Sequence, residues 1–199
     1  MEDDIETWVN AIHLLNEQVA VLTPEQSTYM PQFVTLIIEK LTNECVAKLS
    51  GVHTIPRAYR LVHDSVVDGR PMPYVGEMLD PLVRFYDKYK EKIPVLIWQS
   101  WLLRILDPLI TKYSKTIRSM MTSERHKDIL LKRINRQPPS GPDTDKMMDQ
   151  LRVDVGAIDH VLSTLYNVSL ASINGTCHEL LASFETAESF ASQLAIKIV

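Results

Sequence analysis

The sequence predicts an all-α fold, organised as an elongated bundle of six to eight helices. Apolar residues recur at helical spacing along almost the whole chain. Alternation of the kind typical of β-strands never extends over more than four residues. The 199 residues are 45% apolar and 23% charged, which is the composition of an ordinary folded domain rather than of a disordered or collagen-like chain.

The first helix is expected from about Ile5 to Leu22. Two sets of apolar residues repeat there every seven positions, and one of the sets is Trp8, Leu15 and Leu22. Together the two sets form an apolar stripe along about five turns. Thr23 and Pro24 then provide the cap and the first position of a second helix.

The second helix carries an apolar residue at every fourth position from Phe33 to Cys45. We expect Gly51 to end this helix in a left-handed conformation. A short third helix is predicted from about Pro56 to Val66. A turn rich in glycine and proline follows it at residues 68–73.

Two longer helices follow this turn. One is predicted from Pro73 to about Glu91, with an i,i+4 ion pair between Asp80 and Arg84. The next starts near Pro94, is the most apolar of all, and continues as an amphipathic helix through Arg136. Its apolar run is too short, and too interrupted by charge, to span a membrane.

Three prolines and a glycine make residues 137–144 the clearest linker in the chain. We therefore expect a main helical bundle at residues 1–136 and a C-terminal helical unit at residues 145–199 packed on it. One continuous domain is the alternative. Met148, Leu151, Val155, Ile158 and Leu162 form the apolar stripe of the first helix after the linker.

Charge is concentrated in one segment. The chain has a net charge of −4, whereas residues 112–136 hold eight basic and two acidic side chains. This block fits a solvated face that meets acidic segments of the chain, an acidic protein partner, or phospholipid headgroups. Nucleic acid is not expected, because Tyr113 is the only aromatic residue among these cations. The candidate interaction face consists of Lys112, Lys115, Arg118, Arg125, Lys132, Arg133 and Arg136.

Sequence motifs for catalysis are missing. The six histidines form no HExxH motif, and no two of them lie four residues apart. Cys177 and His178 are neighbours, so on a helix their side chains point about 100° apart and make no dyad. We expect no enzyme activity, no cofactor and no metal.

Three segments, in this order, resemble the C-terminal domain of subunit 2 of the conserved oligomeric Golgi complex. They are Ile-Pro-Arg-Ala-Tyr-Arg at residues 55–60, the pattern from Tyr74 to Leu82, and Asp145-Lys146 leading into Gln-Leu-Arg-Val-Asp-Val at residues 150–155. The similarity extends over about residues 28–190. The motif residues are Pro56, Arg57, Tyr59, Arg60, Tyr74, Leu79, Pro81, Leu82, Leu151 and Asp154.

The resemblance implies a helical-rod fold of the kind found in tethering complexes, and a non-enzymatic role. Such a subunit region supports retrograde intra-Golgi transport through protein–protein contacts, at the cytoplasmic face of Golgi membranes. Its implied partners are the other subunits of the complex, SNAREs, Rab GTPases and coiled-coil tethers. The alternative is a helical protein that binds phospholipid surfaces through the basic face at residues 112–136.

The resemblance also implies roles for the N-terminal apolar residues and for the motif residues. Family members are longer and begin with a coiled coil, so Trp8, Leu15 and Leu22 are a candidate exposed apolar stripe that lacks its covering segment. Most motif residues are expected to be structural: Pro56 starts a helix, and the tyrosines and leucines lie in the core. Arg57 and Arg60 either cap backbone carbonyls or face a partner.

Overall fold

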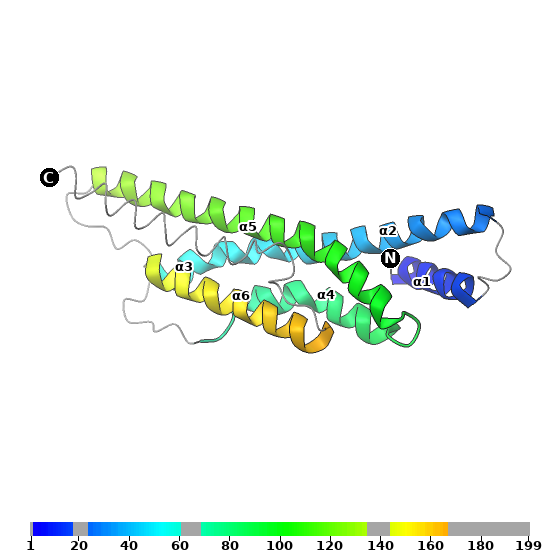
Figure 1. Cartoon of the computed structure of the whole chain (residues 1–199). Coiled ribbons are helices and arrows are strands. Elements are labelled where there is room, and N and C mark those ends of the chain that lie inside the picture. Colours follow the sequence, from blue (N-terminus) through cyan, green and yellow to red (C-terminus); the bar gives the residue numbers. More distant parts are fainter. Residues whose placement is uncertain (1, 18–23, 61–68, 135–143, 167–199) are drawn as a thin grey trace. The chain divides into compact units, whose positions relative to one another are not determined.

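The computed structural model describes residues 2–17, 24–60, 69–134 and 144–166, and these ranges are helical without a β-strand (Figure 1). The predicted all-α class is therefore confirmed. In chain order the elements are α1 (Glu2–Glu17), α2 (Pro24–Ala47), the 3-10 helix η1 (Lys48–Thr54), α3 (Ile55–Arg60), α4 (Pro73–Tyr89), α5 (Val95–Ile134) and α6 (Thr144–Tyr166).

Prolines mark the starts of several helices, as the sequence predicts. Pro24 and Pro73 are the first residues of α2 and α4, where a missing N–H costs nothing because no intrahelical acceptor exists for it. Pro94 directly precedes α5, and its carbonyl oxygen accepts hydrogen bonds from the N–H groups of Ile97 and Trp98, both at 3.0 Å. Helix α6 begins at Thr144, the last residue of the predicted linker.

The chain divides into two compact units that interleave along the sequence. The first unit consists of Met1–Lys48 and Gly76–Leu109, and the second of Leu49–Val75 and the residues from Ile110 onward. Helices α4 and α5 each contribute residues to both units. The predicted linker at residues 137–144 lies almost wholly outside the described residues, as do the helices expected after residue 168.

In the first unit, α1 packs beside α2 (Figure 1) and is tied by polar contacts to α4 and the loop after it. The Lys88 ammonium donates to the Glu6 carboxylate at 2.9 Å, and Lys92 donates to the Asn10 side-chain oxygen at 2.6 Å. The hydrogen bond from Lys88, together with its charge, lowers the pKa of Glu6. The predicted ion pair between Asp80 and Arg84 is present at 2.8 Å, on the exposed side of α4.

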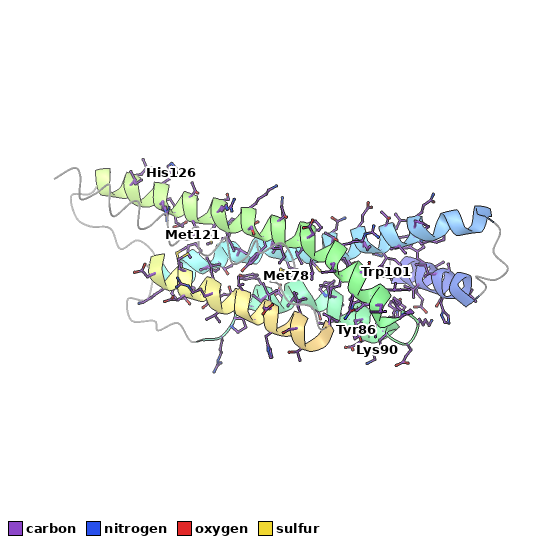
Figure 2. All side chains as sticks on the ribbon, in the orientation of Figure 1. Met78, Tyr86, Lys90, Trp101, Met121 and His126 are labelled. Carbon is purple, nitrogen blue, oxygen red and sulfur yellow. The ribbon has the colours of Figure 1, made fainter. Side chains whose placement is uncertain are left out.

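An aromatic cluster joins α4 to the start of α5 in this unit. The centroid of the Phe85 ring lies 5.3 Å from the ring centroid of Trp98 and 4.9 Å from that of Tyr89. The Tyr86 ring stacks on Trp98 with 5.7 Å between the ring centroids. Figure 2 marks Tyr86 on α4 and Trp101, another buried indole, on α5. Aromatic side chains remove large apolar areas from water, so this cluster contributes strongly to the stability of the unit.

The second unit buries one face each of α5 and α6. On α5 the buried residues after Ile110 include Tyr113, Ile117 and Met121. Met148, Leu151, Ile158 and Leu162 of the predicted α6 stripe are buried, whereas Val155 is half-buried. Helix α6 contacts the short α3 (Figure 1), so two segments separated by about 90 residues pack together.

Gly51 does not have the left-handed conformation that the sequence suggested. The chain continues beyond α2 as the 3-10 helix η1, and Gly69 is the glycine with a positive φ, 67°, in the predicted turn before α4. Gly51 is instead required by packing, because a Cβ atom there would overlap the Cβ atom of Tyr74. The glycine thus permits close approach of η1 and the start of α4.

Candidate functional site

The three motif segments converge on one buried hydrogen-bond network in the second unit. Tyr59 from α3, Tyr74 from the first turn of α4 and Asp154 from α6 all belong to it. Each segment is a weak signal in the sequence. Their side chains meet because α6 packs against α3 and against the turn that leads into α4.

Asp154 is the centre of the network. Its side chain is fully buried, and its two oxygens accept three hydrogen bonds. Oδ1 accepts from the Met72 backbone N–H at 2.8 Å and from the Gln150 side-chain amide at 2.9 Å, while Oδ2 accepts from the Tyr74 hydroxyl at 2.7 Å. Tyr74 has a single hydroxyl proton, so Tyr113 is the donor in the 2.9 Å hydrogen bond between the two hydroxyls.

Gln150, one turn before Asp154, extends the network to the remaining segments. Its amide nitrogen also donates to the Arg70 carbonyl oxygen at 2.9 Å, and its amide oxygen accepts from the Tyr59 hydroxyl at 2.6 Å. Both amide protons and the amide oxygen therefore have partners. A buried polar network with every member satisfied specifies one arrangement, since a displaced segment would leave unpaired groups.

Burial dominates the electrostatics of this network. It raises the pKa of Asp154, an effect that the hydrogen bonds from Tyr74, Met72 and Gln150 partly oppose. Burial also raises the pKa of the Tyr74 hydroxyl, and the nearby Tyr113 and Asp154 raise it further. Because its hydroxyl stays protonated, Tyr74 remains a donor to the Asp154 carboxylate, which fits a structural role.

The remaining motif residues also mostly serve the fold. Pro56 lies in the first turn of α3 and is buried, and Leu151 is buried on α6. Leu79 and Leu82 are buried in the first unit, and Pro81 lies between them inside α4. Tyr59 is half-buried rather than fully buried, and its hydroxyl donates to Gln150. Arg57 is exposed, and the side chain of Arg60 lies outside the described residues.

Sequence reasoning missed two members of the network. Gln150 stands inside a motif segment without an evident role, and Tyr113 is recognisable in the sequence only as an aromatic residue among cations. A signal for Gln150 existed: Gln150 and Asp154 are four residues apart and flank Leu151 on the apolar side of α6, where polar side chains require partners. Nothing in the sequence pairs Tyr113 with Tyr74, because that contact depends on tertiary structure.

The predicted basic face lies on the part of α5 that belongs to the second unit. Lys112, Lys115, Arg118 and Arg125 are all exposed there. The backbone of Lys132 and Arg133 continues α5, but their side chains, and the whole of Arg136, are outside the described residues. The intervening Tyr113 is buried, so it offers no stacking surface to a nucleic-acid base.

The predicted N-terminal stripe is described only in part. Trp8 is half-buried in the first unit, and the Lys40 ammonium lies 6.0 Å from the centre of its ring. The neighbouring Val9 and Ile12 are buried. The side chain of Leu15 and the whole of Leu22 lie outside the described residues, so the exposed stripe stays a prediction.

The described residues contain no cluster of side chains suited to a metal ion, whereas the first unit does have hollows on its surface. No group of three His, Cys, Asp or Glu side chains in this part of the chain is placed to hold a metal ion. One hollow of the first unit, between α1, α2 and α4, has a volume of about 160 Å³, and its lining includes Leu41, Phe85 and Tyr89. A second hollow, lined by His13 and residues 90–95, has a volume of about 330 Å³. None of the helices in the described ranges has the length and apolarity needed to cross a membrane. In these ranges the chain is helical, and most of its described motif residues pack or form hydrogen bonds inside the protein.

The comparisons with known proteins give the family. The family described as "COG complex component, COG2, C-terminal" matches residues 7–155, which is well over half of the chain. The chain therefore belongs to this family, and the resemblance predicted from the three motif segments is confirmed. The matched range starts before, and ends before, the predicted range of about 28–190.

A human relative, "Conserved oligomeric Golgi complex subunit 2", is 29% identical to this chain over 150 residues. The alignment covers 68% of this chain and 20% of the human protein, so the chain spans about a fifth of the length of that relative. No solved structure matches the chain.

Proposed function

We propose that this chain is a non-enzymatic subunit region of a Golgi vesicle-tethering complex that supports retrograde intra-Golgi transport through protein–protein contacts. The family match over residues 7–155 carries this proposal. The structural role of the motif segments supports this proposal, since Tyr74 and Gln150 donate hydrogen bonds to Asp154 inside the protein. The other subunits of the complex are its first partners.

Contacts with those partners would use exposed helix faces, as helices do when they bind grooves or the ends of bundles. The candidate faces are the basic side of α5 and the N-terminal stripe. SNAREs, Rab GTPases and coiled-coil tethers are further partners that this role implies. The chain would sit peripherally, at the cytoplasmic face of Golgi membranes. The family match favours this role over the alternative of a phospholipid-binding protein.

Acute depletion of the chain from its native cells tests the transport role. If returning vesicles are no longer captured, Golgi-resident membrane enzymes should disperse into small carriers within the lifetime of one transport cycle. Re-expression of the intact chain should restore their Golgi distribution. An unchanged distribution, with the chain demonstrably depleted, would contradict the proposed role in retrograde transport.

A further inference from the structure

Four exposed cations form a row on the part of α5 that belongs to the second unit. Lys112, Lys115, Arg118 and Arg125 are exposed, and no ion pair joins any of them to an acidic group of the described chain. Elsewhere in the described ranges several cations have acidic partners, and such pairs include Arg84 with Asp80 and Arg152 with Asp149. We call these four residues the cation row.

The spacing of the cation row makes it a surface rather than four separate charges. Its members are three, three and seven residues apart, which places them within about 140° of the circumference of α5. The row extends over about 20 Å, since each helical residue rises by about 1.5 Å. Glu124, the acidic residue nearest to Arg125, is almost buried and is already paired with Lys127 at 2.5 Å. Among the side chains that the structure describes between residues 111 and 126, no exposed acidic group therefore interrupts the positive charge of the row.

The side chains between the cations indicate what kind of surface fits the row. Thr111, Ser119 and Thr122 are exposed there, and no large apolar side chain is exposed between residues 111 and 126. Helices that bind membrane surfaces combine cations with exposed aromatic or aliphatic side chains that enter the lipid. Exposed aliphatic residues of α5 in this unit, Ile129 and Leu130, come only beyond the end of the row. Short polar side chains instead allow another helix to approach closely.

We propose that the cation row docks an acidic helix of a partner protein. Such a helix would carry about four carboxylates along one side over about 20 Å, so that each cation meets one of them. Arg118 and Arg125 suit this partner because a guanidinium holds a carboxylate through two parallel hydrogen bonds. This inference deepens the proposed function and rests on it, since it names the chemistry of one protein–protein contact of the tethering subunit.

A defined probe tests the proposal on the full chain. The probe is a synthetic helical peptide with four glutamates aligned along one side, and its comparison is an isomer of identical composition with the glutamates spread around the helix. Binding is measured at low salt by fluorescence anisotropy. The aligned peptide should bind at least about fivefold more tightly than the isomer, and the preference should fall as salt screens the charges.

Two variants of equal charge show where the peptide binds. The row variant carries Lys112→Glu, Lys115→Glu, Arg118→Glu and Arg125→Glu. The control carries Lys48→Glu, Arg84→Glu, Lys90→Glu and Arg104→Glu, four exposed cations of the first unit. The row variant should lose at least about tenfold in affinity and the control less than about threefold. If circular dichroism shows that the row variant is unfolded, glutamine replaces glutamate in both sets.

Equal binding of the two peptides, or equal losses in the two variants, would overturn the proposal. Row-dependent binding to phosphatidylserine vesicles without a preference for the aligned peptide would also overturn it, in favour of lipid. Amine labelling of Lys112 and Lys115 in the free chain should be rapid, and protection there before any peptide is added would show that the chain itself covers the row. Assembly with the complex is measured separately, by co-purification, so the proposed function can fail while peptide binding persists.

Discussion

Removing the Asp154 carboxylate should destabilise the protein strongly. In Asp154→Ala the Tyr74 hydroxyl can turn to Tyr113, but the Met72 N–H and one Gln150 amide proton lose their acceptor. An unpaired buried donor costs about 1–3 kcal/mol, so the two cost about 2–6 kcal/mol. Burial of the carboxylate is itself unfavourable, as its raised pKa shows, and removing it recovers part of this cost. We expect a loss of about 2–4 kcal/mol in the free energy of unfolding.

Denaturant unfolding followed by far-ultraviolet circular dichroism measures this loss. The matched control is Asp149→Ala, on the same helix, which removes an exposed carboxylate paired with Arg152 at 2.5 Å. That change should move the unfolding free energy by less than about 0.5 kcal/mol. Equal effects of the two substitutions would refute the reasoning, because the network would then contribute no more than a surface ion pair.

Three further predictions concern glycine packing, the pH dependence of stability and a buried thiol. Gly51→Ala should destabilise the protein by about 1–3 kcal/mol because its new Cβ overlaps Tyr74; Gly156→Ala, in the open on α6, should stabilise it by about 0.5–1 kcal/mol. Thermal denaturation compares these two variants, and a stable Gly51→Ala would contradict the packing. The raised pKa of Asp154 means that the folded state binds its proton more tightly than the unfolded chain. The stability that protonated Asp154 contributes is therefore fully present below its ordinary pKa of 3.8. This stability is lost as the pH rises through the pKa of Asp154 in the folded state. The free energy of unfolding, measured relative to that of Asp154→Asn, should accordingly fall as the pH rises. An increase of this difference with pH would mean that folding lowers the pKa of Asp154 and would contradict the prediction. Burial raises the pKa of the Cys45 thiol to about 12, so iodoacetamide should leave the Cys45 peptide unmodified at about pH 8 until the chain unfolds. Rapid labelling of the folded chain, read by mass spectrometry, would contradict this burial.

Helix starts and buried stripes were predictable because they depend on local sequence. Pro24, Pro73 and the Pro94–Val95 junction mark helix starts that the structure confirms. Met148, Leu151, Ile158 and Leu162 follow from spacing alone, since a helix buries residues three and four apart on one side. The prediction of Gly51 as a helix cap is wrong because the sequence does not show that Tyr74 packs against this glycine.

The network around Asp154 could be predicted only in outline. The resemblance singled out Tyr59, Tyr74 and Asp154, but as separate motif residues with no contact between them. Their meeting depends on α6 reaching α3 and the turn at residues 70–72 across about 80 to 90 positions of sequence. Local periodicity carries no information about such long-range packing. The exposure of the cation row, by contrast, follows from its position opposite the apolar side of α5.

Affinity purification of the tagged chain from its native cells, analysed by mass spectrometry, tests the proposed tethering role most directly. The chain is tagged at its own locus, so that its amount remains normal. We expect the other subunits of the Golgi tethering complex to be recovered with it, and expect Asp154→Ala to recover much less of them than Asp149→Ala does. Recovery of the folded chain without any subunit of that complex would contradict the role of this chain as a tethering subunit.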